Sequence, residues 1–184
     1  MELLQKLRGA LPEARLWIDR QLAAHQAKAR SVASYAFKQL PRHYSPDLLA
    51  TAKVVEIEHV PMLPLSELGL TEFAEFEAGQ YAGITFKNTY FAMPDEAASE
   101  ALHFHELVHV IQWGYLGVDG FLMAYSLGYL QATGADKYRG NPLEAMAYEL
   151  QDRFERGTLS GDVQREVQAR LDAVLPKIFA PFKL

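Results

Sequence analysis

The sequence contains no cysteine. Disulfide bonds are therefore excluded, and so are zinc fingers and other sites that depend on thiolate ligands. Any metal site in this chain must be built from histidine, aspartate and glutamate. A chain without cysteine also fits the reducing cytoplasm, where we expect the protein to be located.

The chain also lacks a long apolar run and a cluster of positive charge. Its longest charge-free stretch near the middle, residues 120–135, is interrupted by Ser126, Gln131 and Thr133. It is shorter than the roughly 20 mostly apolar residues of a membrane span. The N-terminal residues carry scattered charges, unlike a signal peptide. There is no stripe of lysine or arginine, and the formal net charge is -5. We therefore expect neither a membrane nor a nucleic acid as a partner.

What remains is the composition of an ordinary globular protein. Of 184 residues, 49% are hydrophobic and 22% are charged. A chain of this length can bury a substantial core. We interpret residues 1–184 as a single domain, with a helical extension over 1–50 and a metal-site core over 83–155. Nothing in the composition indicates an oligomeric state.

Periodicity and helix-breaking residues predict a mostly helical α+β protein. Residues 12–40 are rich in alanine and free of internal glycine and proline, which predicts one long helix ending before Pro41. Residues 52–60 alternate, and residues 82–92 are rich in β-branched and aromatic side chains, so both predict strands. Four further helices are predicted, the first of them stopping at Gly114: 95–113, 120–132, 141–154 and 163–174.

One stretch, "HFHELVHVIQWGYLG" at residues 103–117, places ionisable side chains inside the most apolar predicted helix. His105 and His109 are one helical turn apart and so share a face, where two imidazoles can bind the same metal ion. Glu106 lies beside the first histidine and can reach a water molecule on the open side of that ion. Burying these groups costs free energy unless something compensates their lost hydration, as a divalent cation would. The pattern therefore predicts a metal site with Glu106 as general base.

A hydrolytic site of this kind needs a third protein ligand. Of the other histidines, His25 is expected at the surface and His43 in a loop. His59 is expected at a strand end, and His103 on the far side of the motif helix. His59 can approach the site, but no spacing in the sequence indicates that it does.

Together with the downstream segment "NPLEAMAYEL", the HELVH motif resembles the gluzincin metallopeptidases, in which H-E-x-x-H is followed some tens of residues later by E-x-x-A on a second helix. The resemblance spans about residues 83–154. It implies a zinc ion held by His105, His109 and Glu144, with Glu106 as the catalytic base. It also implies a small zincin-like sheet packed against the buried motif helix.

The assignment of Glu144 has an alternative. Asn141 precedes it by three positions, which is close to a capping box in which the glutamate caps its own helix. The family spacing favours ligation, and so does the helix face shared with Ala147, whose small side chain lets two helices approach closely. Tyr148 stands where several gluzincins have an aspartate that supports a ligand histidine. Glu149 is the runner-up for the third ligand.

An acyl-transfer site also needs a donor for the developing oxyanion. Four tyrosines fall near the predicted ligand helices: Tyr125, Tyr129, Tyr138 and Tyr148. Tyr138 is preferred because it lies with Arg139 in the loop before "NPLEAMAY".

The resulting expectation is a zinc-dependent hydrolase, a metallopeptidase that acts on a peptide or protein. The strand over 83–92 is either an exposed edge that pairs with an extended substrate or an internal strand. One alternative is a non-catalytic zinc-binding or peptide-recognition module of the same fold. Another is a helical interaction protein in which HELVH is incidental.

Overall fold

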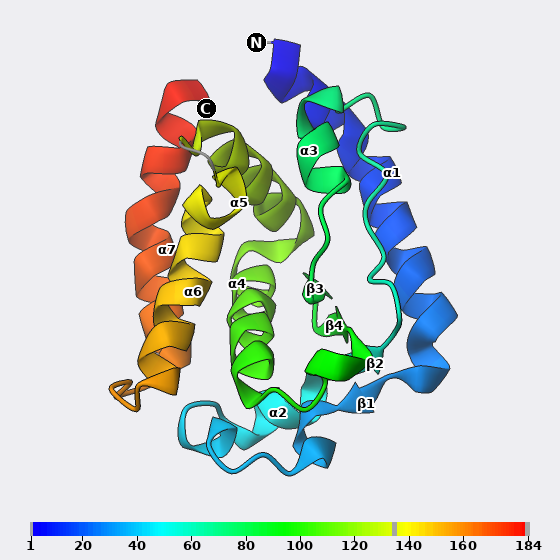
Figure 1. Ribbon diagram of the computed structural model, residues 1–184. Helices are drawn as coiled ribbons and strands as arrows, with labels where there is room; N and C mark the ends of the chain where they lie inside the picture. Colours follow the sequence, from blue (N-terminus) through cyan, green and yellow to red (C-terminus); the bar gives the residue numbers. More distant parts are fainter. Residues whose placement is uncertain (1, 134–135, 183–184) are drawn as a thin grey trace.

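Helices make up most of the structure, and the sheet is small. The computed structural model describes residues 2–133 and 136–182 (Figure 1). The helices are α1 (Glu2–His25), α2 (Pro46–Thr51), α3 (Ala74–Glu77), α4 (Glu100–Gln131), α5 (Lys137–Gly140), α6 (Pro142–Glu155) and α7 (Val163–Phe179). The strands are β1 (Arg30–Ser31), β2 (Lys53–Glu56), β3 (Gly83–Phe86) and β4 (Thr89–Ala92). The mostly helical α+β fold class is confirmed.

The four strands form one mixed sheet in the order β1-β2-β4-β3. β2 and β4 are parallel, whereas the other two pairs are antiparallel. Every residue of the internal strand β4 is buried, and β3 forms one edge of the sheet. α4 lies between the sheet and the pair α6 and α7, so it occupies the centre of the molecule (Figure 1).

The prediction of one helix over 12–40 is wrong at both ends. α1 begins before Pro12 and stops at His25. It continues through the proline because one face, which includes Leu7 and Ile18, is buried, and such packing outweighs one missing N–H group. Beyond α1 the chain enters β1, which pairs with β2. Pairing with a distant segment leaves no periodic pattern in the local sequence.

The segment over 82–92 is a hairpin and not one strand. β3 and β4 are joined at Lys87 and Asn88, and Lys87 has a φ of 59°. This turn contains neither glycine nor proline, so the usual sequence signal of a tight turn is missing. The strand predicted over 52–60 is confirmed only in its first part, because β2 ends at Glu56.

α4 consists of two helices that meet at a kink, so the two separate helices predicted over 95–113 and 120–132 are confirmed apart from their bounds. It starts after its N-cap Ser99, because residues 94–96 form a 3-10 turn, and it passes through Gly114 without a break. A bend falls at Gly117, with φ 67° and ψ 173°, a conformation that glycine adopts without steric cost. The half before the bend carries the HELVH motif, and the half after it turns toward α5 (Figure 1).

α6 and α7 confirm the helices predicted over 141–154 and 163–174, and α7 continues to Phe179. Both pack against α4. Buried side chains at helical spacing on α7, among them Val167 and Leu171, account for this packing.

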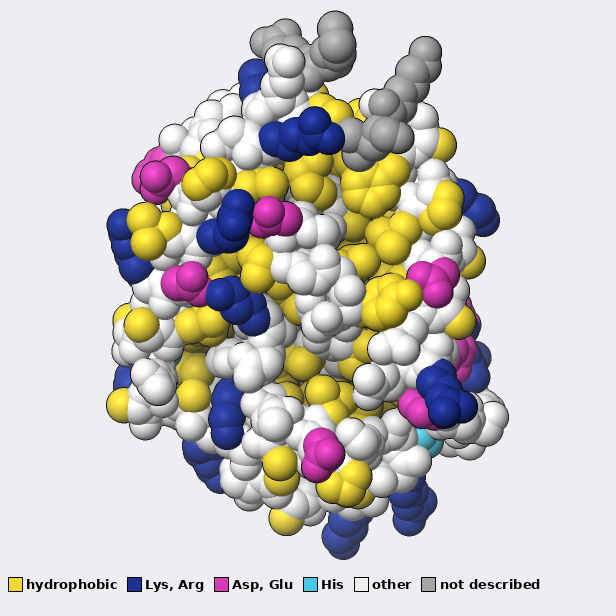
Figure 2. Space-filling view, turned by 180° about the vertical axis from the view of Figure 1, so that it is seen from behind, with side chains coloured by type: hydrophobic (Ala, Val, Ile, Leu, Met, Phe, Trp, Pro, Cys, Tyr) yellow, Lys and Arg dark blue, Asp and Glu magenta, His cyan; other side chains and the backbone are white. Residues whose placement is uncertain are grey.

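Hydrophobic side chains gather along the middle of the face opposite to that of Figure 1, and charged side chains lie mainly toward its margins (Figure 2). Over the described residues, the most exposed large hydrophobic side chains are Leu16, Met93 and Tyr115, with exposed fractions of only 43%, 37% and 43%. Most of this band therefore consists of partly buried side chains. In residues 2–133 and 136–182, no helix combines the length and the apolar character needed to cross a bilayer.

Candidate metal centre

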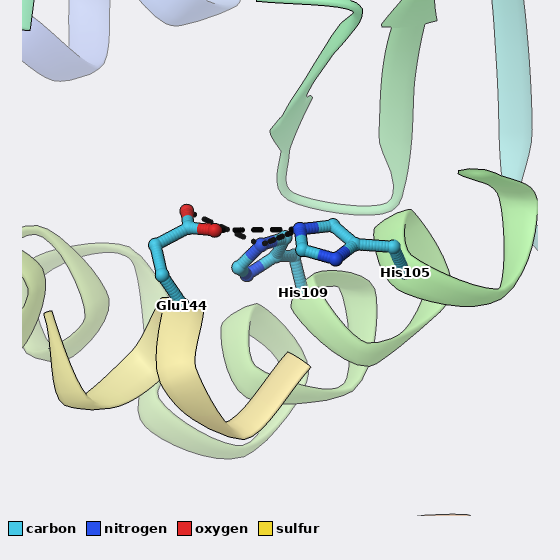
Figure 3. A group of neighbouring side chains, drawn as sticks. All are labelled: His105, His109 and Glu144. Atoms are coloured by element: carbon cyan, nitrogen blue, oxygen red, sulfur yellow. Dashed lines mark hydrogen bonds and ion pairs between the residues drawn. The ribbon is translucent and has the colours of Figure 1, made fainter. Parts of the chain in front are cut away.

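Three buried side chains from two helices converge at one point (Figure 3). His105 and His109 project from neighbouring turns of α4, and Glu144 projects from the first turn of α6. Their exposed fractions are 4%, 5% and 3%, respectively. The Nε2 atoms of the two histidines are 3.1 Å apart, and each lies 3.3 Å from an oxygen of Glu144. The structure thus brings together the three residues that the sequence analysis assigns as ligands.

The separations between these atoms fit the ligand shell of a small divalent cation. Metal–ligand bonds of about 2.0–2.2 Å in a tetrahedral centre place the ligand atoms about 3.3–3.6 Å apart. In addition, Oε2 of Glu144 is buried and has no hydrogen-bond partner. Buried polar atoms without a partner are rare in proteins, and a bound cation would explain this one. The cluster can therefore bind a metal ion.

Hydrogen bonds behind the imidazoles leave their inward nitrogens free for a cation. Nδ1 of His109 lies 2.8 Å from Oε1 of Gln112, whose amide nitrogen donates to a backbone carbonyl of α6. Because the nitrogen of Gln112 is engaged, its oxygen accepts and Nδ1 of His109 carries the proton. Nδ1 of His105 is likewise 3.1 Å from Oε1 of Gln151. With Nδ1 of both rings in contact with a glutamine oxygen, the two Nε2 atoms face each other and the Glu144 carboxylate, an arrangement that a cation or a proton between them would stabilise.

The sequence analysis assigns no role to three polar residues of the site, Gln112, Gln151 and Thr85. Gln112 follows His109 by three positions on α4, a spacing that could have indicated it, whereas Gln151 reaches His105 from α6. An aspartate is absent from the position where several gluzincins have one. There Tyr148 packs its ring against that of His105, with 4.5 Å between the centroids. Glutamine amides thus take over the orientation of both ligand histidines.

Replacing Gln151 with leucine should weaken metal binding by about 10–100-fold, the usual cost of losing a partner that orients a ligand histidine. Gln151 is half-buried, so a side chain of similar volume should leave the fold intact. Competition with a chromogenic chelator measures the affinity. Gln168→Leu on α7 serves as the control, because that residue lies outside the cluster. Equal affinities of Gln151→Leu and the wild type would show that this contact does not orient His105.

The first turn of α6 packs closely against the second half of α4. Asn141 caps α6 by accepting a hydrogen bond from the N–H of Leu143, and its own amide donates to the carbonyl of Tyr125 at 3.2 Å. Gly128 makes this approach feasible, because a Cβ atom there would lie 2.7 Å from Oδ1 of Asn141. This contact places the first turn of α6, and hence Glu144, opposite the histidines.

The capping-box alternative for Glu144 is wrong. The backbone N–H of Asn141 donates to the carbonyl of Tyr138 and not to a glutamate side chain. Oε1 of Glu144 instead accepts a hydrogen bond of 2.7 Å from the hydroxyl of Tyr125. The carboxylate therefore faces the histidines of α4.

Burial and charge act in opposite directions on the titration of the cluster. Burial alone would raise the pKa of Glu144, but the charge of His109 and the close approach of both imidazoles hold that pKa well below its usual range. Burial alone would lower the pKa of His109, but the Glu144 carboxylate raises it well above the usual value. The metal-free cluster therefore retains a proton that a metal ion must displace, so metal affinity should fall in acid.

Glu106 lies beside the three ligand residues without joining them. The hydroxyl of Thr85 donates to Oε2 of Glu106 at 2.6 Å. Its Oε1 occupies the space next to Gly83, where an added Cβ atom would lie only 2.5 Å away. Burial raises the pKa of Glu106, although the two neighbouring histidines and Thr85 oppose the rise. A buried carboxyl group with a raised pKa beside a cleft has the properties of a general base.

Tyr138 reaches the site, as the sequence analysis expects. It is half-buried and lines the same two cavities as Glu106. Burial and the Glu144 carboxylate raise the pKa of its hydroxyl, which therefore stays protonated and can donate a hydrogen bond. Arg139 turns instead over the ring of Tyr148, 4.2 Å from the centroid.

The other residues considered as ligands lie elsewhere. His103 is fully buried on the far side of α4, where it bonds the hydroxyl of Tyr90 and the carbonyl of Ala97. Glu149, the runner-up, forms an ion pair with Arg170 at the surface. Three further histidines also lie outside the cluster: His25, His43 and His59. Of these, His25 is not simply a surface residue, because it is half-buried and its ring packs edge-on against a core phenylalanine of β4.

Comparisons of the chain with protein-family models, with curated proteins and with solved structures found no significant match. The resemblance to the gluzincins consequently rests on the motif residues themselves. The function is therefore inferred below from the chemistry of the site.

Removing the metal should lower the thermal unfolding midpoint by about 5–10 °C. An ion present at 100 times its dissociation constant stabilises the folded state by about 2.7 kcal/mol, and each kcal/mol shifts the midpoint of a chain of this size by about 2–4 °C. Without it, the cluster keeps two histidines and Glu144 buried around an unsatisfied oxygen. Thermal scans with zinc and with excess chelator test this prediction. Identical midpoints would mean that the folded protein holds no metal.

Proposed function

We propose that the protein is a zinc-dependent hydrolase that cleaves peptides or proteins. The position of Glu106 is the observation that carries this proposal. Its side chain is buried, adjoins the cluster of His105, His109 and Glu144, and lines both cavities next to the cluster. A centre that only binds a metal ion for stability needs no additional carboxylate of this kind. A hydrolase needs one, because a base must remove a proton from the attacking water.

The ligand atoms favour zinc. Two imidazole nitrogens and one carboxylate oxygen are a frequent set in catalytic zinc sites, which keep three protein ligands and one open position. When bound there, zinc supplies a Lewis acid and lowers the pKa of a coordinated water to about 7. The cysteine-free composition supports a cytoplasmic location for this chemistry.

The protein groups around the cluster have distinct roles in the proposed reaction. Glu106 accepts the proton of the attacking water and later delivers it to the leaving amine. Thr85 holds one oxygen of Glu106, so that the other faces the cleft beside Gly83. Tyr138 keeps its hydroxyl proton and offers it to the developing oxyanion.

The edge of the sheet can orient an extended substrate. Met93 N–H donates to the carbonyl of Ala82, so in the antiparallel hairpin the backbone groups of Gly83 and Thr85 point away from β4. The carbonyl of Thr85 accepts from the indole of Trp113, whereas Gly83 lines the open cleft. A peptide added at Gly83 would lie directly beside Glu106. Of the residues 83–92, β3 lies at an edge of the sheet and is partly buried, whereas β4 is an internal strand.

A peptide-library digest tests the proposal. Zinc-loaded protein should cleave a subset of peptides, excess chelator should stop the cleavage, and added zinc should restore it. Mass spectrometry of the products identifies the cleaved bonds. A broad library left intact by fully zinc-loaded protein would overturn the proposal.

Such a result would favour the alternative, a non-catalytic zinc-binding or peptide-recognition module. The near-complete burial of all three ligands supports this second function, because structural zinc sites are typically closed. It predicts that peptides bind in the cleft but remain uncut.

A further inference from the structure

Two cavities meet at Glu106. The inner cavity, about 90 Å³ for the centres of water-sized molecules, is lined on its metal side by His109 and Glu144. The outer cavity, about 420 Å³ by the same measure, is lined on its metal side by His105. Four residues line both cavities: Tyr81, Gly83, Glu106 and Tyr138. Glu106 therefore adjoins two different environments.

The inner cavity is apolar. Apart from the groups at its metal end, its walls are mainly aromatic and aliphatic side chains from the 63–76 segment, β3 and both halves of α4, such as Leu63, Phe73, Phe76, Trp113 and Phe121. At about 15 Å³ for each water-sized group, the cavity accommodates on the order of six such groups. That space matches a large apolar side chain, which gains free energy by leaving water.

The outer cavity is acidic at its mouth. Glu96 and Glu155 line it, and both are exposed. Within residues 2–133 and 136–182, neither forms an ion pair, whereas Glu149 and Glu166 are paired with arginines. Among the described residues that line the two cavities there is no lysine or arginine. The cleft thus offers negative charge to a substrate and no partner for a carboxylate.

We propose that the substrate is a peptide segment with a bulky apolar side chain for the inner cavity and a lysine or arginine for the outer cavity. This inference rests on the proposed function, since it names the substrate class of the same site. An acidic residue at the outer position is repelled by Glu96 and Glu155. A terminal carboxylate near the scissile bond is disfavoured, because no described lysine or arginine lines either cavity.

Binding of uncut peptides tests the proposal. Each fluorescently labelled peptide carries Phe or Ser at one position and Lys or Glu at a second position. The two positions are one to three residues apart, and both orders are used. They are titrated by anisotropy against zinc-loaded Glu106→Gln protein, which should hold them without cutting. Replacing Phe with Ser should weaken binding about 10–100-fold, the usual effect of exposing one large apolar side chain. Replacing Lys with Glu should weaken it about 10-fold at low salt and less at high salt.

Two variants assign these preferences to the two cavities. Ser126 is a small, half-buried residue of the inner lining. Ser126→Phe should fill the cavity and abolish the preference for Phe over Ser, whereas Ser160→Phe in an exposed loop should not. The double variant Glu96→Gln, Glu155→Gln should abolish the preference for Lys over Glu. The control Glu58→Gln, exposed and outside both linings, should keep it.

The possible outcomes test the proposed substrate class and the proposed hydrolysis separately. Equal binding of all peptides, or preferences unchanged in Ser126→Phe and in the glutamate double variant, would overturn the substrate class even if the wild type cleaves peptides. Selective binding without any cleavage by the wild type would support the substrate class and overturn hydrolysis. Absence of binding by every peptide would overturn the substrate class.

Discussion

Replacing Glu144 with alanine should weaken zinc binding by more than about 100-fold. Loss of a residue that merely orients a ligand already costs about 10–100-fold, and Glu144 faces both imidazoles directly. The remaining pair, His105 and His109, presents too few ligands for a tight site. Competition titration against a chromogenic chelator of known affinity measures the loss, and circular dichroism confirms that the variant is folded.

Glu149→Ala is the matched control for this experiment. It lies on the same helix and was the runner-up for the third ligand, but its carboxylate is paired with Arg170 at the surface. Its removal should leave zinc affinity within about a factor of two, as expected for a change that touches no ligand. If Glu144→Ala binds one zinc ion as tightly as the wild type, the ligand assignment is wrong.

Replacing Glu106 with glutamine should reduce peptide cleavage by about 10²–10⁴-fold while zinc binding is retained. The range is the usual contribution of a general base. Glutamine keeps the shape of the side chain and can still accept the hydrogen bond that Thr85 donates, but it cannot take up a proton from water. Turnover is measured on a peptide that the wild type cleaves, and zinc content is measured on the same samples.

Metal content separates the role of Glu106 from that of the ligands. Loss of a ligand should empty the centre, whereas loss of the base should leave it filled and inactive. The control variant Glu58→Gln should retain full turnover, because Glu58 is exposed and lines neither cavity. Wild-type turnover in Glu106→Gln would exclude a general-base role, and loss of zinc in that variant would show that Glu106 contributes to metal binding.

The sequence was sufficient for the part of the site that a single helix determines. His105, Glu106 and His109 lie within about one helical turn, so the period of the helix fixes how they face one another. Glu144 required the resemblance to a family, because its placement depends on the contact between Asn141 and Gly128, which are distant from the motif. Such a contact between helices leaves no mark in local periodicity.

The remaining errors have the same physical origin. Helical spacing places Gln151 on the same face as Glu144, but its contact with His105 could not be predicted because that contact joins two helices. The helix predicted over 12–40 was wrong because β1 is stabilised by pairing with β2, not by its own residues. The break between the helices predicted over 95–113 and 120–132 is confirmed, but it falls at Gly117 and not at Gly114, because either glycine could end a helix.

The bend at Gly117 divides the attachments of the candidate ligands. His105 and His109 precede the bend, whereas Glu144 is attached through Asn141 to the backbone of Tyr125, which follows it. An ion bound by all three side chains would therefore cross-link the two parts of α4. The inner cavity is lined by both parts, through Trp113 and Phe121 among others, so the cross-link would join two of its walls.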